Sequence, residues 1–395
     1  MKMEEWKEVR LEECVSLLGD GLHGTPKYTE NGEYAFINGN NLTNGRIVIK
    51  PETKRINEDE YLKYKKNLTD RTIFVSINGT IGNVGTYNGE KIILGKSACY
   101  FNVLDDIDKT FIKYIVSSPS FKTYLETNAT GTTIKNVSLA QMRNYSFLLP
   151  PLPTQQKIAT ILSSLDDKIE LNNKINTNLE QQAQALFKNW FVDFEPFGGK
   201  MPGGWKVGKL SEILCLKKNP IQPGEDTSLP YLPIDLIPIK SLAIREVRPN
   251  EEALSSLLRF DENDILIGAM RVYFHRVAIA PFEGITRTTC FVLEPFDPSY
   301  FAYGAITCNQ DLAIDYAQKT SKGSTMPYAV WEGGLGDFEI PIPDEATAAK
   351  FNNIVKPLLE QIKKSYFENE TLQELRESLL PKLMNGEIDV DKVIL

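Results

Sequence analysis

The feature that most constrains this chain is an internal repeat at an offset of about 193 residues. Short phrases recur in the same order in both copies, and the matched pairs are Trp6-Lys-Glu-Val with Trp205-Lys-Val, Thr72-Ile-Phe-Val-Ser with Asp264-Ile-Leu-Ile-Gly, Lys96-Ser-Ala-Cys99 with Arg287-Thr-Thr-Cys290, Gly131-Thr-Thr with Gly323-Ser-Thr, and Phe147-Leu-Leu-Pro150 with Ile340-Pro-Ile-Pro343. Short apolar runs such as the second pair are typical of strands. The repeat therefore predicts two similar domains, each with a sheet.

Each copy ends in a long segment whose stripe residues recur about every 3.5 positions, as in a helix that packs against another helix. The stripe of the first copy is Ile158, Leu162, Leu165, Ile169, Asn172, Asn176, Leu179, Ala183, Leu186 and Trp190, and that of the second is Phe351, Val355, Leu358, Ile362, Ser365, Asn369, Leu372, Arg376, Leu379 and Leu383. We expect a first helix from Thr154 to Phe191, about 57 Å long. Pro357 should kink the second helix or delay its start.

The polar members of the stripe predict how the two helices pair. If the helices lie antiparallel and centred, Asn172 stands opposite Asn369 and Asn176 opposite Ser365. Buried asparagines of this kind fix the register of a helix pair at a cost in stability. A parallel pairing matches these residues equally well. However, the compact domain between the helices has its ends near each other, and a parallel return would have to cross the full helix length. We therefore expect the antiparallel arrangement.

The predicted fold is α+β, with two tandem domains at opposite ends of an antiparallel coiled coil and a pseudo-twofold internal repeat. The domain bounds that follow are residues 1–153 and 197–343 for the two α+β domains, and 154–196 and 344–395 for the two helices with the C-terminal tail. The alternative is a long amphipathic helix in each of two unrelated domains. The repeat disfavours it, because the matches extend well beyond the helices.

Composition narrows the function classes. The net charge of −8 is unlike that of a protein that clamps DNA along its whole surface, because phosphate contacts dominate such binding. DNA would have to be held by local patches or with the help of partners. The sequence has no long apolar run that predicts a membrane span or a secretory signal. Its five cysteines are scattered without a Cys-x-x-Cys pair, so we expect neither zinc sites nor disulfides. This usage of cysteine indicates a reducing cytoplasm as the location of the protein.

Several segments resemble those of one known family. They are Gly19-Asp-Gly-Leu-His-Gly-Thr-Pro-Lys-Tyr28, Tyr34-Ala-Phe-Ile-Asn-Gly-Asn-Asn-Leu42, Gly131-Thr-Thr-Ile, Leu148-Leu-Pro-Pro-Leu-Pro-Thr-Gln-Gln-Lys-Ile158 and Leu375-Arg-Glu-Ser-Leu-Leu-Pro-Lys-Leu-Met-Asn-Gly-Glu-Ile388. In this order they resemble the specificity subunits of type I restriction–modification systems over nearly the whole chain. The second domain departs from the pattern, because its 221–239 stretch is rich in proline and lacks a His-Gly-Thr-Pro opening.

The resemblance implies a division of labour. Each recognition domain would read one half of an asymmetric, bipartite DNA target, while the helices set the gap and dock two methyltransferase subunits. Two motor–nuclease subunits would complete the enzyme. S-adenosylmethionine, ATP and Mg²⁺ would act on those partners, so this chain is expected to need no cofactor or metal and to have no catalytic residues of its own.

A search for catalytic motifs supports that expectation. The only two histidines, His23 and His275, fall in different copies. Asp297-Pro-Ser-Tyr300 resembles the target-amine motif of amino-methyltransferases, but Ser299 replaces the second proline and no glycine-rich cofactor loop precedes it. Gly79-Thr-Ile-Gly-Asn-Val-Gly85 and Gly95-Lys-Ser97 lack the spacing of a phosphate-binding loop. Turns and bulges beside strands account for these glycines better.

Polar and basic loop residues near the predicted strands are the candidates for DNA contact, because Arg and Lys pair with guanine, Asn and Gln with adenine, and hydroxyl groups with phosphates. The candidates in the first domain are His23, Lys27, Tyr28, Asn38, Asn40, Asn41, Arg46, Asn78, Thr132 and Lys135, and those in the second are Arg271, Tyr273, His275, Arg276, Lys319, Lys322, Ser324 and Thr325. For each of them a solvated loop position is the plain alternative. Gly24, Gly131 and Gly323 are expected to shape loops.

Two further features leave alternatives open. Trp190, Phe191, Phe194 and Phe197 cluster at the end of the first helix, either as packing within the chain, which we favour, or as a contact with a partner. Two other functions compete with DNA reading: a fused methyltransferase or nuclease with degenerate motifs, and a coiled-coil scaffold that carries two domains for other ligands. Neither explains a tandem repeat joined by matched helices, whereas a pseudo-twofold reader addresses two half-sites on one duplex.

Overall fold

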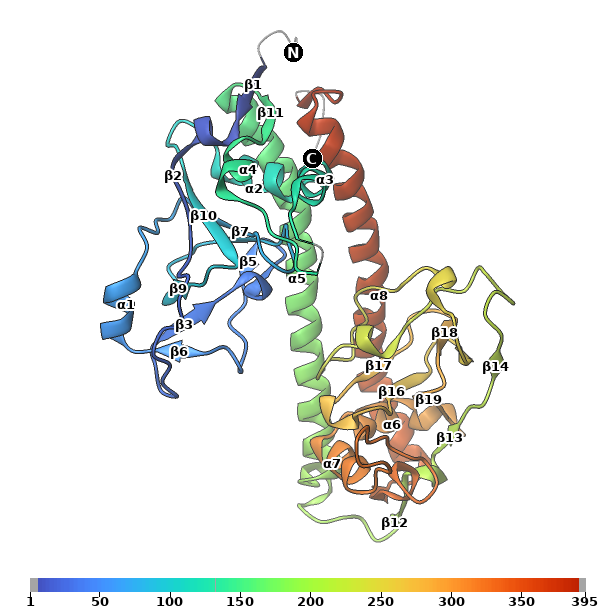
Figure 1. Ribbon diagram of the computed structural model, residues 1–395. Coiled ribbons are helices and arrows are strands. Elements are labelled where there is room, and N and C mark those ends of the chain that lie inside the picture. Colours follow the sequence, from blue (N-terminus) through green and yellow to red (C-terminus); the bar gives the residue numbers. More distant parts are fainter. Residues whose placement is uncertain (1–5, 132, 391–395) are drawn as a thin grey trace. The chain divides into compact units, whose positions relative to one another are not determined.

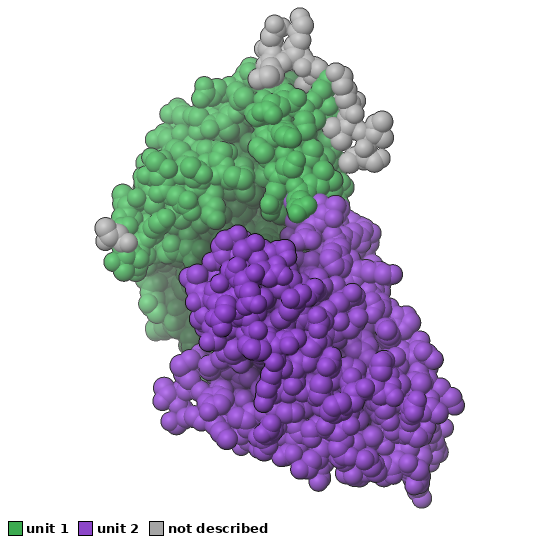
Figure 2. Space-filling model, turned by 90° about the vertical axis from the view of Figure 1, so that its right-hand side faces the viewer, with its two compact units in different colours: residues 1–166, 374–395 green, residues 167–373 purple. Residues whose placement is uncertain are grey.

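The computed structural model describes residues 6–390 except Thr132 (Figure 1). The chain divides into two compact units, which Figure 2 colours separately. Unit 1 consists of residues 1–166 and 374–395, and unit 2 of residues 167–373. Both divisions fall inside long helices, so each unit contains a part of each helix. The fold is mixed, with helices and sheets in both units.

The two long helices are α5 (Leu152–Phe191) and α8 (Glu345–Met384), each of 40 residues. Helix α5 begins two residues before the expected Thr154 and ends at the expected Phe191. Pro357 lies inside α8, so the delayed start that we considered for this helix is wrong. An interior proline removes one backbone hydrogen bond, and the helix continues past it because its apolar face is held by packing.

Within unit 2 the segments of α5 and α8 run antiparallel. In unit 2, Asn172 Nδ2 donates to Asn369 Oδ1 over 2.9 Å, and Asn176 Nδ2 donates to Ser365 Oγ over 2.6 Å. In unit 1, Arg376 Nη1 lies 2.8 Å from Asp166 Oδ1. The partner number falls on α8 as the residue number rises on α5, which is the mark of an antiparallel pair.

Unit 1 is built on a four-stranded antiparallel sheet in the order β2-β10-β7-β8. Its strands are β2 (Val15–Asp20), β10 (Ala98–Val103), β7 (Thr72–Ser76) and β8 (Val84–Thr86). All six residues of β10 are buried because both faces of the sheet are covered. Cys99, Phe101 and Val103 pack in the core that includes α2 (Lys109–Ser117) and α3 (Pro119–Asn128), while Ala98 and Tyr100 pack in a second cluster on the other face.

Smaller elements complete unit 1. A two-stranded sheet pairs β1 (Lys7–Arg10) with β11 (Ser146–Leu149), and a three-stranded sheet has the order β6-β3-β9, from β6 (Arg55–Ile56), β3 (Tyr34–Ile37) and β9 (Ile92–Leu94). Strands β3 and β9 are parallel, and the other pairs are antiparallel. The remaining elements are β4 (Leu42–Thr43), β5 (Arg46–Ile47), α1 (Glu58–Tyr64) and α4 (Leu139–Arg143).

Unit 2 repeats this plan. Its four-stranded sheet has the order β13-β19-β16-β17, from β13 (Leu214–Leu216), β19 (Cys290–Pro295), β16 (Ile265–Gly268) and β17 (Val277–Ile279). The pair β12 (Lys206–Lys209) with β20 (Glu339–Ile342) corresponds to β1 with β11, and α6 (Phe301–Cys308) with α7 (Asp311–Lys319) follows β19 as α2 and α3 follow β10. The expected strand pair, Thr72–Ser76 and its second-copy match, occupies equivalent positions as β7 and β16.

The third sheet is where the two units differ. In unit 2 it has the order β14-β15-β18, from β14 (Pro220–Ile221), β15 (Leu257–Phe260) and β18 (Gly284–Arg287), and all its pairs are antiparallel. The proline-rich 221–239 stretch follows β14, without a regular strand between Ile221 and Leu257. Proline cannot donate to a strand ladder, which accounts for this irregular path. The common sheet thus carries a variable addition in each unit.

The aromatic cluster at the end of α5 packs within unit 2. The ring of Phe191 lies 5.6 Å from Trp205 and 4.8 Å from Phe351 of α8, and Phe197 lies 5.0 Å from Trp205. Burial of large rings in such tilted and edge-to-face contacts stabilises this end of the helix. The favoured alternative, packing within the chain, is therefore confirmed for these rings. No described helix is long and apolar enough to span a membrane.

Candidate DNA interface in each unit

A short loop stands at the equivalent place in both units. In unit 1, Asn136 forms isolated bridges with Thr130 and Asn78, and in unit 2 Tyr328 does the same with Lys322 and Met270. These loops contain the repeated Gly-Thr-Thr and Gly-Ser-Thr phrases. The same backbone scaffold therefore carries amide side chains in one unit and a thioether with a phenol in the other.

The unit 1 loop is tightly closed. Gly131 has a φ of +91°, and a Cβ there would lie 2.3 Å from the carbonyl oxygen of Ile134, so only glycine fits. Asn78 Nδ2 donates to Asn136 Oδ1 over 3.1 Å, which leaves Asn78 Oδ1 as an acceptor and Asn136 Nδ2 as a donor at a partly exposed edge. Lys135 is exposed. Thr132 lies outside the described residues.

The opening of unit 1 presents three of the predicted residues on its surface. His23 is exposed, with Nε2 2.6 Å from Asp20 Oδ2. Lys27 and Tyr28 are exposed as well, and the Tyr28 ring packs edge-on against Phe36 at 5.7 Å. An exposed basic side chain beside a tyrosine that is anchored in this way suits contact with a phosphate backbone.

The three predicted asparagines at the end of β3 have different surroundings. Asn40 is exposed. Asn38 is half-buried, and its Oδ1 accepts a hydrogen bond from Ser97 Oγ over 2.9 Å. Asn41 is 5% exposed, and its Nδ2 donates to the Val48 carbonyl over 2.9 Å. The amide of Asn41 thus holds its own loop together and is turned inward, unlike that of Asn40. Arg46, in β5, is exposed.

In unit 2 the turn after β16 holds four predicted residues. Arg271, just before the short 3₁₀ turn Val272–Phe274, and Tyr273, within it, are both exposed. His275 is only 5% exposed, with Nδ1 3.1 Å from Asp311 Oδ1 and Nε2 2.9 Å from Asn309 Oδ1. The surface role that we considered for His275 does not fit this position, because both ring nitrogens have partners within the unit.

Arg276 also turns partly inward. Its Nη1 donates to the Asp235 carbonyl over 2.9 Å and to the Ile237 carbonyl. Burial lowers the pKa of the Arg276 guanidinium, and the nearby Asp235 carboxylate partly offsets this effect. Arg276 therefore secures the proline-rich 221–239 stretch against the sheet. The remaining predicted residues of unit 2, Lys319, Lys322, Ser324 and Thr325, are exposed.

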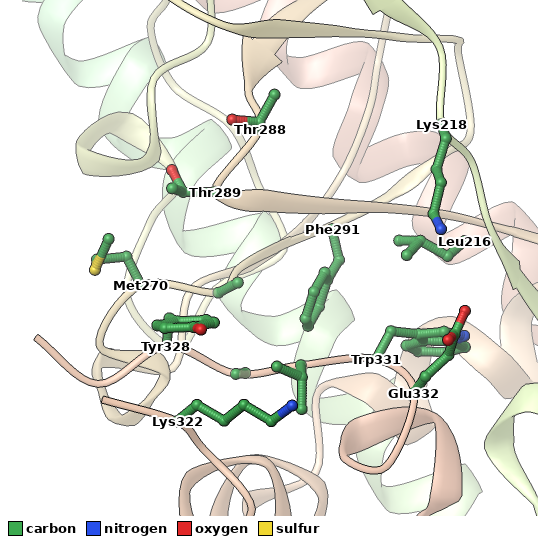
Figure 3. Close-up of a pocket in the computed structure, with 13 residues that line it drawn as sticks. Leu216, Lys218, Met270, Thr288, Thr289, Phe291, Lys322, Tyr328, Trp331 and Glu332 are labelled. Carbon is green, nitrogen blue, oxygen red and sulfur yellow. The ribbon is translucent and has the colours of Figure 1, made fainter. Parts of the chain in front are cut away.

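Two adjoining concavities open beside this turn. The first, of about 580 Å³, is lined by Phe291, Tyr328 and Trp331, with Lys218 and Lys322 among its polar residues (Figure 3). The lining of the second, of about 620 Å³, includes the four arginines Arg248, Arg271, Arg276 and Arg287 and the two acidic residues Asp235 and Glu252. Both concavities include Met270 and Thr289, so they form one surface. Basic side chains interleaved with aromatic rings are what a nucleic-acid surface requires.

Sequence reasoning missed several residues of this surface. Lys218 and Arg248 come from segments far apart in the chain, and no local motif marks them, whereas Arg287 opens a repeated phrase but was not chosen as a candidate. Asn136 and Tyr328 carried a usable signal, because they occupy matched positions in the two copies and follow the repeated glycine phrases. A reader of two different half-sites needs different side chains at matched positions.

The described side chains do not assemble a metal site. Among the described residues, no group of three or more His, Cys, Asp or Glu is placed to hold a metal ion. Burial raises the pKa of the Cys14, Cys290 and Cys308 thiols to about 12, which disfavours the thiolate that nucleophiles and metal ligands require.

Comparison with known proteins points to one family. Residues 3–181 match the family model of the type I restriction modification DNA specificity domain. The type I restriction enzyme MjaIX specificity subunit of Methanocaldococcus jannaschii is 27% identical over 93% of this chain and 87% of its own length. The HindI specificity subunit of Haemophilus influenzae is 24% identical over 65% of this chain and 72% of its own length.

A solved structure shares the fold. The crystal structure of the type I restriction–modification S subunit from M. genitalium has a TM-score of 0.58 and 19% identity, and the match covers 96% of both chains. Together with the family model, these matches confirm the resemblance drawn from the sequence phrases.

Proposed function

We propose that this chain, which belongs to the family of type I restriction–modification specificity subunits, selects the DNA sequence on which such a complex acts. The observation that carries the proposal is the duplicated loop scaffold. Matched bridges hold Asn78 with Asn136 in one unit and Met270 with Tyr328 in the other. A single scaffold with two sets of side chains suits two different half-sites, so the target is bipartite and asymmetric.

The basic and aromatic surface of unit 2 supports the same role. Arginine and lysine side chains neutralise phosphates and pair with guanine, and aromatic rings make apolar contact with bases. The net charge of −8 is compatible with this function, because six basic residues but only three acidic ones line the two adjoining concavities and form a local basic patch. DNA binding by a local patch also explains why the whole chain need not be basic.

Helices α5 and α8 act, in this proposal, as one antiparallel coiled coil that spaces the two half-sites and docks two methyltransferase subunits. The Asn172–Asn369 and Asn176–Ser365 contacts support a fixed register, which a spacer of defined length requires. The recognition domains are residues 1–153 and 197–343, and the helical parts are 154–196 and 344–395.

The chain itself is a non-catalytic subunit in this proposal. Methyl transfer from S-adenosylmethionine belongs to the methyltransferase subunits, and ATP- and Mg²⁺-dependent translocation and cleavage belong to two motor–nuclease subunits. The duplex DNA is then shared between all of them, with this chain supplying the sequence choice.

A methylation map of the host genome tests the proposed function. The map is recorded with the gene intact, deleted, and restored from a plasmid. We expect one split, asymmetric methylated motif to disappear on deletion and to return on complementation. An identical map in the intact and deleted strains would contradict the proposal. Methyl transfer by the purified chain alone, with S-adenosylmethionine as donor, would contradict the non-catalytic role.

A further inference from the structure

The turn after β16 in unit 2 keeps two non-glycine residues in a left-handed backbone conformation. Arg271 has a φ of +50° and His275 a φ of +52°. The corresponding turn of unit 1, after β7, has Gly79 at +79° and Gly82 at +85°. Glycine adopts this conformation without strain, whereas a side chain makes it unfavourable. Unit 2 therefore retains strain that unit 1 avoids.

The surroundings hold this strained turn in place. The backbone N–H of Arg271 donates to the Pro327 carbonyl over 2.8 Å, and the N–H of Lys240 donates to the His275 carbonyl over 2.8 Å. The buried His275 ring is fixed by Asn309 and Asp311. A strained backbone persists only where its neighbours hold it, and such positions cluster at functional sites.

Arg271 differs from Arg248 and Arg276 in what its side chain does, and from the half-buried Arg287 in being exposed. It lines the concavity together with Arg248, which lies 2.6 Å from Asp235, and Arg276, which donates to backbone carbonyls. Within residues 6–390, Thr132 aside, the exposed Arg271 forms no ion pair or side-chain hydrogen bond. The turn thus presents an uncommitted guanidinium at a fixed point of the basic surface.

We propose that Arg271 is the residue of unit 2 that selects a guanine in its half-site. The guanidinium presents a planar fork of donors, which matches the O6 and N7 acceptors of guanine in the major groove. This explains why arginine stands where the backbone favours glycine: the strain is retained because the side chain is needed. The proposal rests on the proposed function in DNA selection and adds the residue and the base to it.

Arg271→Gly separates recognition from folding, because glycine suits a φ of +50° while it removes the guanidinium. Asn44→Gly is the control for the backbone change. Asn44 is also exposed and at a φ of +50°, but it belongs to unit 1 and lines neither concavity. The melting temperature of each purified full-length variant is measured, and each variant replaces the chromosomal copy for a methylation map.

For Arg271→Gly we expect an unchanged or higher melting temperature and a motif in which one guanine of one half-site becomes degenerate. The preference for that guanine should fall by about 5- to 150-fold, the range of one bidentate contact. Asn44→Gly should leave the motif unchanged. Arg271→Asn, which also tolerates this backbone, should shift the preference at that position toward adenine.

An unchanged motif in Arg271→Gly would overturn the inference and leave the proposed function standing. A lower melting temperature with loss of the whole motif would show a structural role for Arg271 and would overturn it as well. If deletion of the gene leaves the methylation map unchanged, the proposed function fails and the inference fails with it.

Discussion

Asn172 Nδ2 donates a hydrogen bond to Asn369 Oδ1 over 2.9 Å and so joins α5 to α8 inside unit 2. Both side chains are less than a tenth exposed, and Glu368 Oε2 accepts a second hydrogen bond from Asn172. One turn further along α5, Asn176 donates to Ser365, while its own Oδ1 has no hydrogen-bond partner among the described residues. This polar layer fixes one register of the two helices, at a cost in stability.

The Asn172–Asn369 pair predicts opposite effects for single and double substitution. Asn172→Leu should lower the free energy of unfolding by about 1–3 kcal/mol, because the Asn369 amide stays buried without its donor. Asn172→Leu with Asn369→Leu should restore or exceed the wild-type value, because both polar groups are then replaced by apolar ones. Urea unfolding of the purified chain measures both. Equal losses of unfolding free energy in the two variants would contradict the pairing. Asn178→Ala, on the exposed face of the helix, is the control.

Asp166 predicts a pH dependence of stability. Burial alone would raise the pKa of this carboxyl, but hydrogen bonds from Tyr114 and Arg376 and the charge of Lys113 outweigh it, so the pKa lies below its ordinary value of 3.8. A lowered folded-state pKa adds stability above pH 3.8, and this contribution is lost as the pH falls through the folded-state pKa.

Asp166→Asn should therefore be less stable than the wild type at pH 7, and the difference should shrink below about pH 4, where the unfolded carboxyl also takes up a proton. Melting temperatures at pH 7, 5 and 3.5 measure this. A difference that is constant across that range would show that the charge of Asp166 does not stabilise the folded state.

Neighbouring asparagines of unit 1 predict distinct effects on recognition and stability. Asn40→Ala should weaken recognition of one half-site only, with the melting temperature unchanged, because Asn40 is exposed. Asn41→Ala should lower the stability by about 1–3 kcal/mol, because it removes buried hydrogen bonds to Val48 and Thr53. Binding to duplexes with altered half-sites measures the first effect. Equal binding to all half-site variants before and after the Asn40 change would exclude a role for Asn40 in reading DNA.

We expect the length of the two long helices to set the length of the gap between the half-sites. Removing seven residues from each of α5 and α8 shortens each by about 10 Å, or about three base pairs of duplex. The methylated motif should keep both half-sites and lose about three base pairs from the gap. A gap of unchanged length would mean that the helices do not set the spacing. A seven-residue insertion in each helix is the complementary variant, and it should lengthen the gap.

His275 predicts a positioning effect. His275→Ala removes the ring that ties the turn to Asn309 and Asp311, so we expect a loss of about 1–3 kcal/mol and weaker selection at the half-site read by unit 2. Melting temperature and the methylation map measure the two effects. Selection that is intact in spite of the lower stability would show that the turn keeps its shape without the ring.

Repetition made much of the fold predictable. The stripe residues placed α5 within two residues of its observed start, and the shared phrases predicted two similar domains, whose four-stranded sheets have matching strand orders in the structure. The prediction from Pro357 was wrong about the start of α8. A single proline in a helix of 40 residues destabilises the helix less than the packing on both sides of it stabilises it.

The candidate site was less predictable. The burial of His275 depends on Asn309 and Asp311, more than 30 residues away, and the inward turn of Asn41 depends on Val48 and Thr53. No periodicity reports such contacts. The strained φ of Arg271 could not be predicted either, because the sequence shows only a basic residue at that position. The strain becomes evident when its backbone is compared with that of Gly79 in the structure.

Unit 1 is discontinuous in the chain, since its core takes Leu380, Leu383 and Val390 from α8 and the residues after it. The ribosome makes the sheets of unit 1 first. The core of unit 1 is completed only after unit 2 has been synthesised, because Leu380, Leu383 and Val390 follow unit 2 in the chain. Unit 2 needs only residues 167–373 and can be complete earlier. A chain whose synthesis stops between the two would thus lack a finished first unit, so the unit that is begun first is the last to be completed.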